Sequence, residues 1–119
     1  MLKRTIYCGA LRETHIGQDA VVTGWVQTKR DMGGVVFIDL RDREGILQVV
    51  FDARNLPEDQ FSAADRLKNE TVIAVRGYVR QRDAETINPR LETGTVELRA
   101  QELEVISEAD PLPFSVEDG

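Results

Sequence analysis

The chain has 119 residues, with one cysteine, one histidine and a formal net charge of −6 at pH 7. This length fits one domain that buries its own hydrophobic core. One cysteine excludes an internal disulfide, and one cysteine with one histidine excludes a zinc site built from these ligands. No apolar run approaches the roughly 18 residues of a membrane span and the N-terminus has no signal-peptide pattern, so we expect a cytoplasmic protein without a membrane partner.

The acidic charge is concentrated toward the C-terminus. Six of the 21 acidic residues follow Gln101, where there is no Lys or Arg, and the first 100 residues carry 15 acidic and 15 basic residues. A neutral body disfavours non-specific binding to a long polyanion. A local basic patch can nevertheless read a few nucleotides.

The first 30 residues predict a short lead-in followed by a long strand. Residues 1–18 form this lead-in, and within it residues 6–11 mix small and apolar residues, which indicates a short helix or turn. His15 has no paired acid or nucleophile at a motif spacing, so we interpret it as structural. In the strand expected at 19–30, Gly24 indicates a bulge or bend. We interpret Trp25 as a packing residue at this bend, with a ligand platform as the alternative.

Residues 24–51 predict a meander of three antiparallel strands. After the first strand come a turn at 31–34, a strand at 35–40, a turn at 41–45 and a strand at 46–51. Because side chains alternate along a strand, an outward Asp39 places Phe37 on the same open face, and we expect Gln48 to be open as well. The inward rows are then apolar: Val36, Ile38, Leu40, Leu47, Val49 and Phe51.

The open face of this meander has the chemistry of a nucleotide site. Phe37 supplies a flat ring and Gln48 an amide, and the cations Lys29 and Arg30 lie close in sequence. An unpaired nucleobase and its phosphate need these groups. The alternative is that Phe37 belongs to the core of a strand buried on both faces, and the pattern alone leaves both interpretations open.

A helix and a fourth strand follow. The proline and acids at 56–59 predict the start of a helix, which ends near Asn69 and plugs one end of the sheet. The strand is expected at 71–82. Its inward row contains Ile73, Val75, Gly77 and Val79, and its outward row Arg76, Tyr78, Arg80 and Arg82. The outward arginines suit phosphate binding or base stacking, or form a solvated face with ion pairs.

A polar loop at 83–94 leads to a fifth strand at 96–99, with Glu97 outward, and residues 103–106 extend or follow it. This order predicts an all-β fold with one helix: the OB-fold, a five-stranded Greek-key barrel that binds oligonucleotides or oligosaccharides on its second and third strands and nearby loops. No catalytic constellation is present. Asp39, Asp42 and Glu44 are the nearest candidates, and we interpret them as turn and solvent-face charges.

The segments GWV, FIDLRDREG, QVVF and TGTVE resemble the N-terminal anticodon-binding domain of bacterial-type aspartyl-tRNA synthetases, and the resemblance runs through the whole chain to PLPF. The resemblance implies an OB-fold domain at 1–107 and, at 108–119, the start of a linker to an absent class II catalytic domain. That absent domain would use ATP and Mg²⁺ and carry most of a homodimer interface. No catalytic residue, cofactor or metal site is expected in this chain itself.

The resemblance also implies a partner and a set of anticodon-binding residues. The partner is the anticodon loop of aspartate tRNA, with asparagine tRNA as a second substrate in some members. Phe37 would stack on the central base, a uridine. The other implied residues are Arg30 on the anticodon loop, Gln48 and Glu97 as hydrogen-bonding groups, Arg80 and Arg82 on the basic fourth strand, and Asn88 in the loop that follows. Met32 and Thr86 occupy positions that vary in the family, and Lys29 departs from its usual arginine.

Two other functions stay open at this point. The first is a freestanding OB protein that binds single-stranded nucleic acid with little sequence preference and a strong salt dependence. The second is an OB-type protein-interaction module, in which Phe37 and Tyr78 would be the aromatic anchors.

Overall fold

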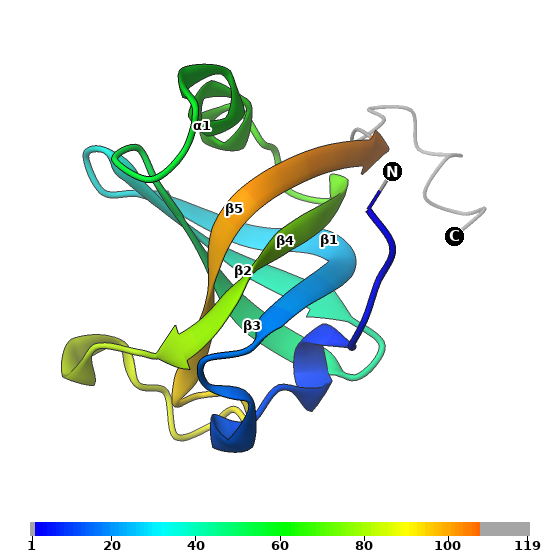
Figure 1. Cartoon of the computed structure of the whole chain (residues 1–119), viewed down its shortest axis with the longest axis vertical. Helices are drawn as coiled ribbons and strands as arrows, with labels where there is room; N and C mark the ends of the chain where they lie inside the picture. The colour runs from blue at the N-terminus through cyan, green and yellow to red at the C-terminus, as the bar shows by residue number, and fades with distance from the viewer. Residues whose placement is uncertain (1, 108–119) are drawn as a thin grey trace.

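Five strands close into a barrel in the order β1-β2-β3-β5-β4 (Figure 1). The computed structural model describes residues 2–107, so the linker expected at 108–119 lies outside the described residues. The strands are β1 (Asp19–Asp31), β2 (Val35–Asp42), β3 (Gly45–Asp52), β4 (Val72–Gln81) and β5 (Val96–Ser107), and the helix α1 is Glu58–Asp65. All neighbours are antiparallel except β3 and β5, which run parallel. The predicted OB-fold is confirmed.

The bend in β1 allows one strand to serve two neighbours. Residues up to Trp25 pair with β4, and residues from Trp25 onward pair with β2. A Cβ added at Gly24 would lie 2.3 Å from the carbonyl oxygen of Arg41, so only glycine permits the strands to approach this closely. The register with β2 shifts between Val26 and Thr28, so the bulge in β1 lies just after Gly24 and not at it. Trp25 lies beside Gly24 and keeps part of its ring exposed.

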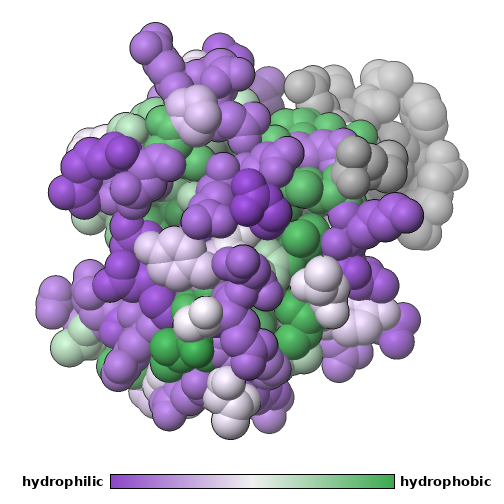
Figure 2. Space-filling model, in the orientation of Figure 1, coloured by the Kyte–Doolittle hydropathy of each residue, from purple (hydrophilic) through white to green (hydrophobic). Residues whose placement is uncertain are grey.

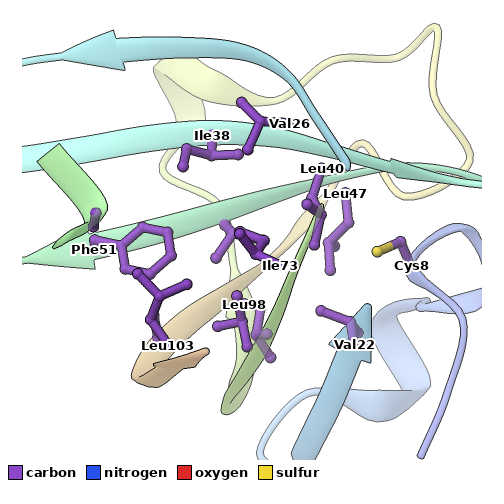
Figure 3. Packing of buried hydrophobic residues seen from close by; sticks show 14 of the residues in the cluster. Cys8, Val22, Val26, Ile38, Leu40, Leu47, Phe51, Ile73, Leu98 and Leu103 are labelled. Carbon is purple, nitrogen blue, oxygen red and sulfur yellow. The ribbon is translucent and has the colours of Figure 1, made fainter. Parts of the chain in front are cut away.

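The barrel interior is filled by alternating side chains, as the inward rows predict. The predicted inward residues of β2 and β3 are all fully buried: Val36, Ile38, Leu40, Leu47, Val49 and Phe51. Figure 3 shows Ile38 and Phe51 directed into the same interior as Ile73 and Leu98 from β4 and β5. Each such side chain contributes roughly 1.5–3 kcal/mol of hydrophobic stabilisation.

The helix α1 lies at one end of the barrel, opposite the loop between β4 and β5 (Figure 1). Its last residue is Asp65, earlier than the predicted end near Asn69. The helix stops because the chain must reverse toward β4. Glu70 takes a left-handed conformation (φ 75°), and its N–H donates to the carbonyl of Val26 at 2.7 Å. Leu67, in the reversing segment, is buried in the core.

The strand β5 is longer than the predicted 96–99, because it continues without a break to Ser107 and pairs with the whole of β4. Opposite Arg76 and Gly77 the register shifts, which leaves Gln101 as an extra residue in β5. Such a bulge reverses the inward and outward alternation. The alternation in the sequence therefore breaks at a point where the strand itself does not.

The lead-in forms a short 3-10 helix at Cys8–Ala10, as expected, and a second at Glu13–His15 that was not predicted. The buried carboxylate of Asp42 accepts hydrogen bonds from the backbone N–H groups of Cys8, Gly9 and Glu44. It thereby ties the first 3-10 helix to the turn between β2 and β3. Burial raises the pKa of the Cys8 thiol, which keeps it protonated and unreactive. His15 accepts from the N–H of Arg12 through Nδ1, which supports its structural interpretation.

Candidate nucleic-acid interface

One row of outward residues crosses four strands of the barrel. The strand register pairs Asp39 with Gln48, Gln48 with Glu97, and Glu97 with Arg80. Residues paired in register share a face of the sheet. The sheet therefore aligns an acid, an amide, an acid and a guanidinium across β2, β3, β5 and β4.

Phe37 lies beside this row, on the outer face of β2. It is half-buried and is not part of the core cluster, so the prediction of an outward ring is confirmed and the alternative of a core residue is wrong. Arg30, its partner in β1, places its guanidinium carbon 5.7 Å from the ring centroid. A ring with an adjacent cation can stack on a base while the cation attracts phosphate.

Gln48 faces outward but is not open, which corrects the sequence prediction. Only 1% of its surface is exposed. Its Nε2 donates to Oε1 of Glu97 at 3.0 Å, and its Oε1 accepts from Nη2 of Arg30 at 3.4 Å. Long side chains from β1 and β5 therefore cover the amide.

Glu97 is also outward and covered, with 5% of its surface exposed. Its Oε2 lies 3.7 Å from Nη1 of Arg99 and 3.8 Å from Nε of Arg80. Burial raises the pKa of Glu97, while the hydrogen bond from Gln48 and the two arginines act in the opposite direction. This carboxylate is an acceptor in a low-dielectric setting, where an unpaired partner is costly.

Arg82 is buried with 6% exposure and does not extend into solvent, a second correction. Its Nε donates to the carbonyl of Val96 at 2.9 Å and its Nη1 to that of Thr86 at 2.8 Å. Nη2 is buried without a partner among the described residues. Burial lowers the pKa of this guanidinium. Arg82 therefore holds the loop after β4 in place.

A pocket of about 440 Å³ opens between this loop and the sheet. Gln27, Arg30, Asp39, Ile46 and Gln48 line it from the sheet, and Arg82, Glu85, Thr86, Asn88 and Leu91 from the loop side. Asn88, implied by the resemblance, thus reaches the same site as the sheet residues. Its Oδ1 accepts from the backbone N–H of Arg90 at 3.0 Å, which orients the amide.

Other basic residues predicted near the site lie elsewhere. Lys29 points away from Arg30, and its Nζ donates to the carbonyl of Asp65 at the end of α1. Arg76 pairs with Glu102 at 3.1 Å and with Gln101 at 3.0 Å, so the ion-pair interpretation of the β4 face holds for this residue. Figure 2 shows a largely hydrophilic face on which apolar surface appears in separate patches.

Sequence reasoning missed two residues of this network, Arg99 and Asp52. Arg99 donates through Nη2 to Oδ2 of Asp52 at 3.2 Å, and Arg54 donates to the same oxygen at 2.8 Å. The hydrogen bond from Arg54 and the charges of both arginines lower the pKa of Asp52 to about 2. Arg99 is two residues from Glu97, and this spacing on one strand face was the signal that could have identified it.

Stacking, hydrogen-bond readout and cationic attraction are thus available here. Within residues 2–107, no three His, Cys, Asp or Glu side chains gather as metal ligands do, and no helix is long and apolar enough to span a membrane. An OB-fold barrel with an outward aromatic ring and polar side chains beside it has the features of an oligonucleotide binder. The chain belongs to the tRNA_anti-codon family of OB-fold nucleic acid binding domains, whose profile matches residues 20–106.

Full-length relatives extend this assignment. The chain is 51% identical over 117 residues to an aspartate–tRNA(Asp/Asn) ligase of Endomicrobium trichonymphae, covering 98% of the chain and 20% of that protein. It is 49% identical over 119 residues to an aspartate–tRNA ligase of Listeria monocytogenes, covering all of the chain and 20% of that protein. The crystal structure of an asparaginyl-tRNA synthetase of Pyrococcus horikoshii, complexed with asparaginyl-adenylate, superposes with a TM-score of 0.76 at 28% identity, over all of this chain and 26% of that one. The resemblance inferred from the motifs is confirmed, and the chain spans about one fifth of the length of these ligases.

Proposed function

We propose that this chain is the anticodon-binding domain of an aspartate–tRNA ligase and binds the anticodon loop of aspartate tRNA. The observation that carries the proposal is the outward row from Asp39 through Gln48 and Glu97 to Arg80, with Phe37 beside it. This row combines a stacking surface with directional hydrogen-bonding groups. The similarity to aspartate–tRNA ligases over the whole chain supports the same function.

Each residue of the interface has a role in this proposal. Phe37 stacks on the central anticodon base, a uridine, with Arg30 near the adjoining phosphate. Gln48 and Glu97 read base edges, because an incorrect base leaves a buried donor or acceptor unpaired. Two further residues, Arg80 and Asn88, contact the anticodon loop at the edges of the pocket.

Arg82 has a different role from the one expected of a basic surface residue. Its guanidinium supports the loop that forms one wall of the pocket. Its free Nη2 is a donor for a base carbonyl or a phosphate oxygen that enters the pocket. A buried unpaired donor favours a ligand that brings an acceptor.

The aminoacylation chemistry belongs to the rest of the ligase. We infer a class II catalytic domain that follows the 108–119 linker, binds ATP and Mg²⁺ and forms most of a homodimer interface, in a cytoplasmic enzyme. This chain spans one fifth of such ligases. We propose that it contributes anticodon recognition to the whole ligase.

The relatives include ligases named for aspartate tRNA alone and for both aspartate and asparagine tRNA. Two positions that the resemblance implies to vary lie at different places in this chain. Thr86 lines the pocket, and Met32 is exposed in the turn between β1 and β2. We propose that contacts at these two positions decide whether the asparagine anticodon is accepted.

The test is the affinity of the domain for three anticodon stem-loops at one salt concentration. The first carries the aspartate anticodon, the second the asparagine anticodon, and the third the aspartate anticodon with its central uridine replaced. Selective loss of binding with the replaced uridine is the expected result. Equal binding to all three would contradict the proposal and would leave a general single-strand binder or a protein-interaction module.

A further inference from the structure

From Glu97, polar contacts also run along β5 to Arg99 and from there to Asp52 at the end of β3. Arg99 bridges two carboxylates, with Nη1 3.7 Å from Oε2 of Glu97 and Nη2 3.2 Å from Oδ2 of Asp52. Asp52 is itself buried and is also bound by Arg54. This bridge lies outside the pocket and does not line it.

The two carboxylate oxygens of Glu97 have different partners. Oε2 faces the guanidinium groups of Arg99 and Arg80, while Oε1 accepts from Nε2 of Gln48. An ionised carboxylate only accepts hydrogen bonds. Gln48 must therefore turn its NH₂ group toward Glu97 and its oxygen toward Arg30 and the pocket. The orientation of the base-reading amide follows from the charge of Glu97.

We propose that Arg99, anchored by Asp52, is a positioning residue that keeps Glu97 ionised and thereby fixes the hydrogen-bonding pattern that Gln48 presents to a base. This inference rests on the proposed function of the interface. A protonated Glu97 would be able to donate, and the amide of Gln48 would then be free to turn over. The site would lose its fixed acceptor and with it part of its selectivity.

Arg99 is the best placed of the charges around Glu97 to act in this way. Its side chain is 17% exposed, whereas that of Arg80, on β4, is 42% exposed and more strongly screened by water. The remaining charged groups near Glu97 are Arg82 and Asp83 directly after β4, Asp39 on β2, and Arg30 on β1 through Gln48. Of these, Asp83 opposes ionisation.

The experiment measures binding of the aspartate stem-loop and of the uridine-replaced stem-loop as a function of pH. For the wild type, selectivity falls as the pH decreases through the pKa of Glu97, which burial raises. The pH interval over which selectivity is lost is the acidic limb of this profile. In Arg99→Gln, we expect the acidic limb to move up by about one pH unit, because a cation within a few ångströms of Glu97 is lost. Selectivity at intermediate pH should fall about tenfold, the worth of one charge-assisted hydrogen bond.

Three further variants complete the test. Arg99→Lys should return the limb toward its wild-type position, since it keeps the charge. Asp52→Asn should shift the limb in the same direction as Arg99→Gln, because it releases the anchor, and it serves as the test if Arg99→Gln does not fold. Arg76→Gln removes an ion-paired arginine on the outer face of β4 and should leave the limb unchanged.

Two outcomes separate this inference from the proposed function. A folded Arg99→Gln or Asp52→Asn variant with an unshifted limb and full selectivity would overturn the positioning role. A wild-type domain that does not distinguish the two stem-loops at any pH would instead overturn the proposed function.

Discussion

The two faces of β3 are both buried, but different kinds of side chain bury them. Toward the interior, Leu47, Val49 and Phe51 are fully enclosed by apolar neighbours. Toward the outside, Gln48 and Asp52 are covered by arginines and a carboxylate. Apolar burial is non-directional and scales with area, whereas polar burial requires a partner for each donor and acceptor. The inner face of β3 should therefore set stability, and its outer face selectivity.

The largest expected effect comes from a substitution on the inner face of β3 alone. Leu47→Ala leaves a cavity in the core and should lower the free energy of unfolding by about 2–5 kcal/mol. Denaturant unfolding monitored by circular dichroism measures this loss. The folded fraction should still prefer the aspartate stem-loop, because the outer row is intact. Unchanged stability with lost selectivity would reverse the assignment of the two faces.

A smaller effect is expected on binding when the outer surface of the barrel is changed. Phe37→Ala should weaken binding of the aspartate stem-loop by ~1–3 kcal/mol, since a stacking contact is lost. Thermal stability should change little, because the half-buried ring is outside the core. Tyr78→Ala is the matched control, an aromatic on the outer face of β4 that does not line the pocket. A large drop in the Tm of Phe37→Ala would show that the ring supports the fold.

The smallest effect concerns the pH dependence of stability on the outer face. Asp52 has a folded pKa of about 2, below the ordinary 3.8, so its stabilising contribution is full above about pH 4 and is lost as the pH falls toward 2. Asp52→Asn should therefore lower Tm by about 4 °C near pH 6. The two Tm values should converge as the pH falls through 2. A difference that does not shrink as the pH falls would mean that Asp52 acts through packing and not through its charge.

Glu97 contributes with the opposite sign. Its folded pKa lies above the ordinary value, so the folded protein binds the proton more tightly and stability falls as the pH rises through the interval above 4.5. The two acids of one network thus respond to pH in opposite directions. Asp52 favours the folded state when ionised, and Glu97 is kept ionised at some cost to stability.

Strand alternation was sufficient to predict the inward rows and the outward position of Phe37. Both depend on a period of two, which is visible over a few residues. The burial of Gln48 could not be read in this way, because Glu97, its partner, is 49 positions away in sequence. Local pattern shows which face a side chain takes but not which distant side chain covers it.

Arg82 and β5 show two further limits. Strand alternation predicts that Arg82 points outward into solvent. The loop after β4 instead folds back over this side chain, and the conformation of a loop leaves no periodic signal in the sequence. In β5, the bulge at Gln101 reverses the alternation and conceals the continuity of the strand. Arg99 was missed for a related reason, since its function depends on Asp52 in another strand.

The parallel pairing of β3 with β5 has a consequence for the time at which the domain becomes functional. This pairing joins only three residue pairs, and one of them is Gln48 with Glu97. Contacts this distant in sequence form late, because closing a long loop must precede them. A chain emerging from a ribosome can assemble the meander of β1, β2 and β3, but Gln48 has no Glu97 partner until β5 has been synthesised and has closed the barrel. Partly made copies should therefore not compete with the finished domain for its RNA.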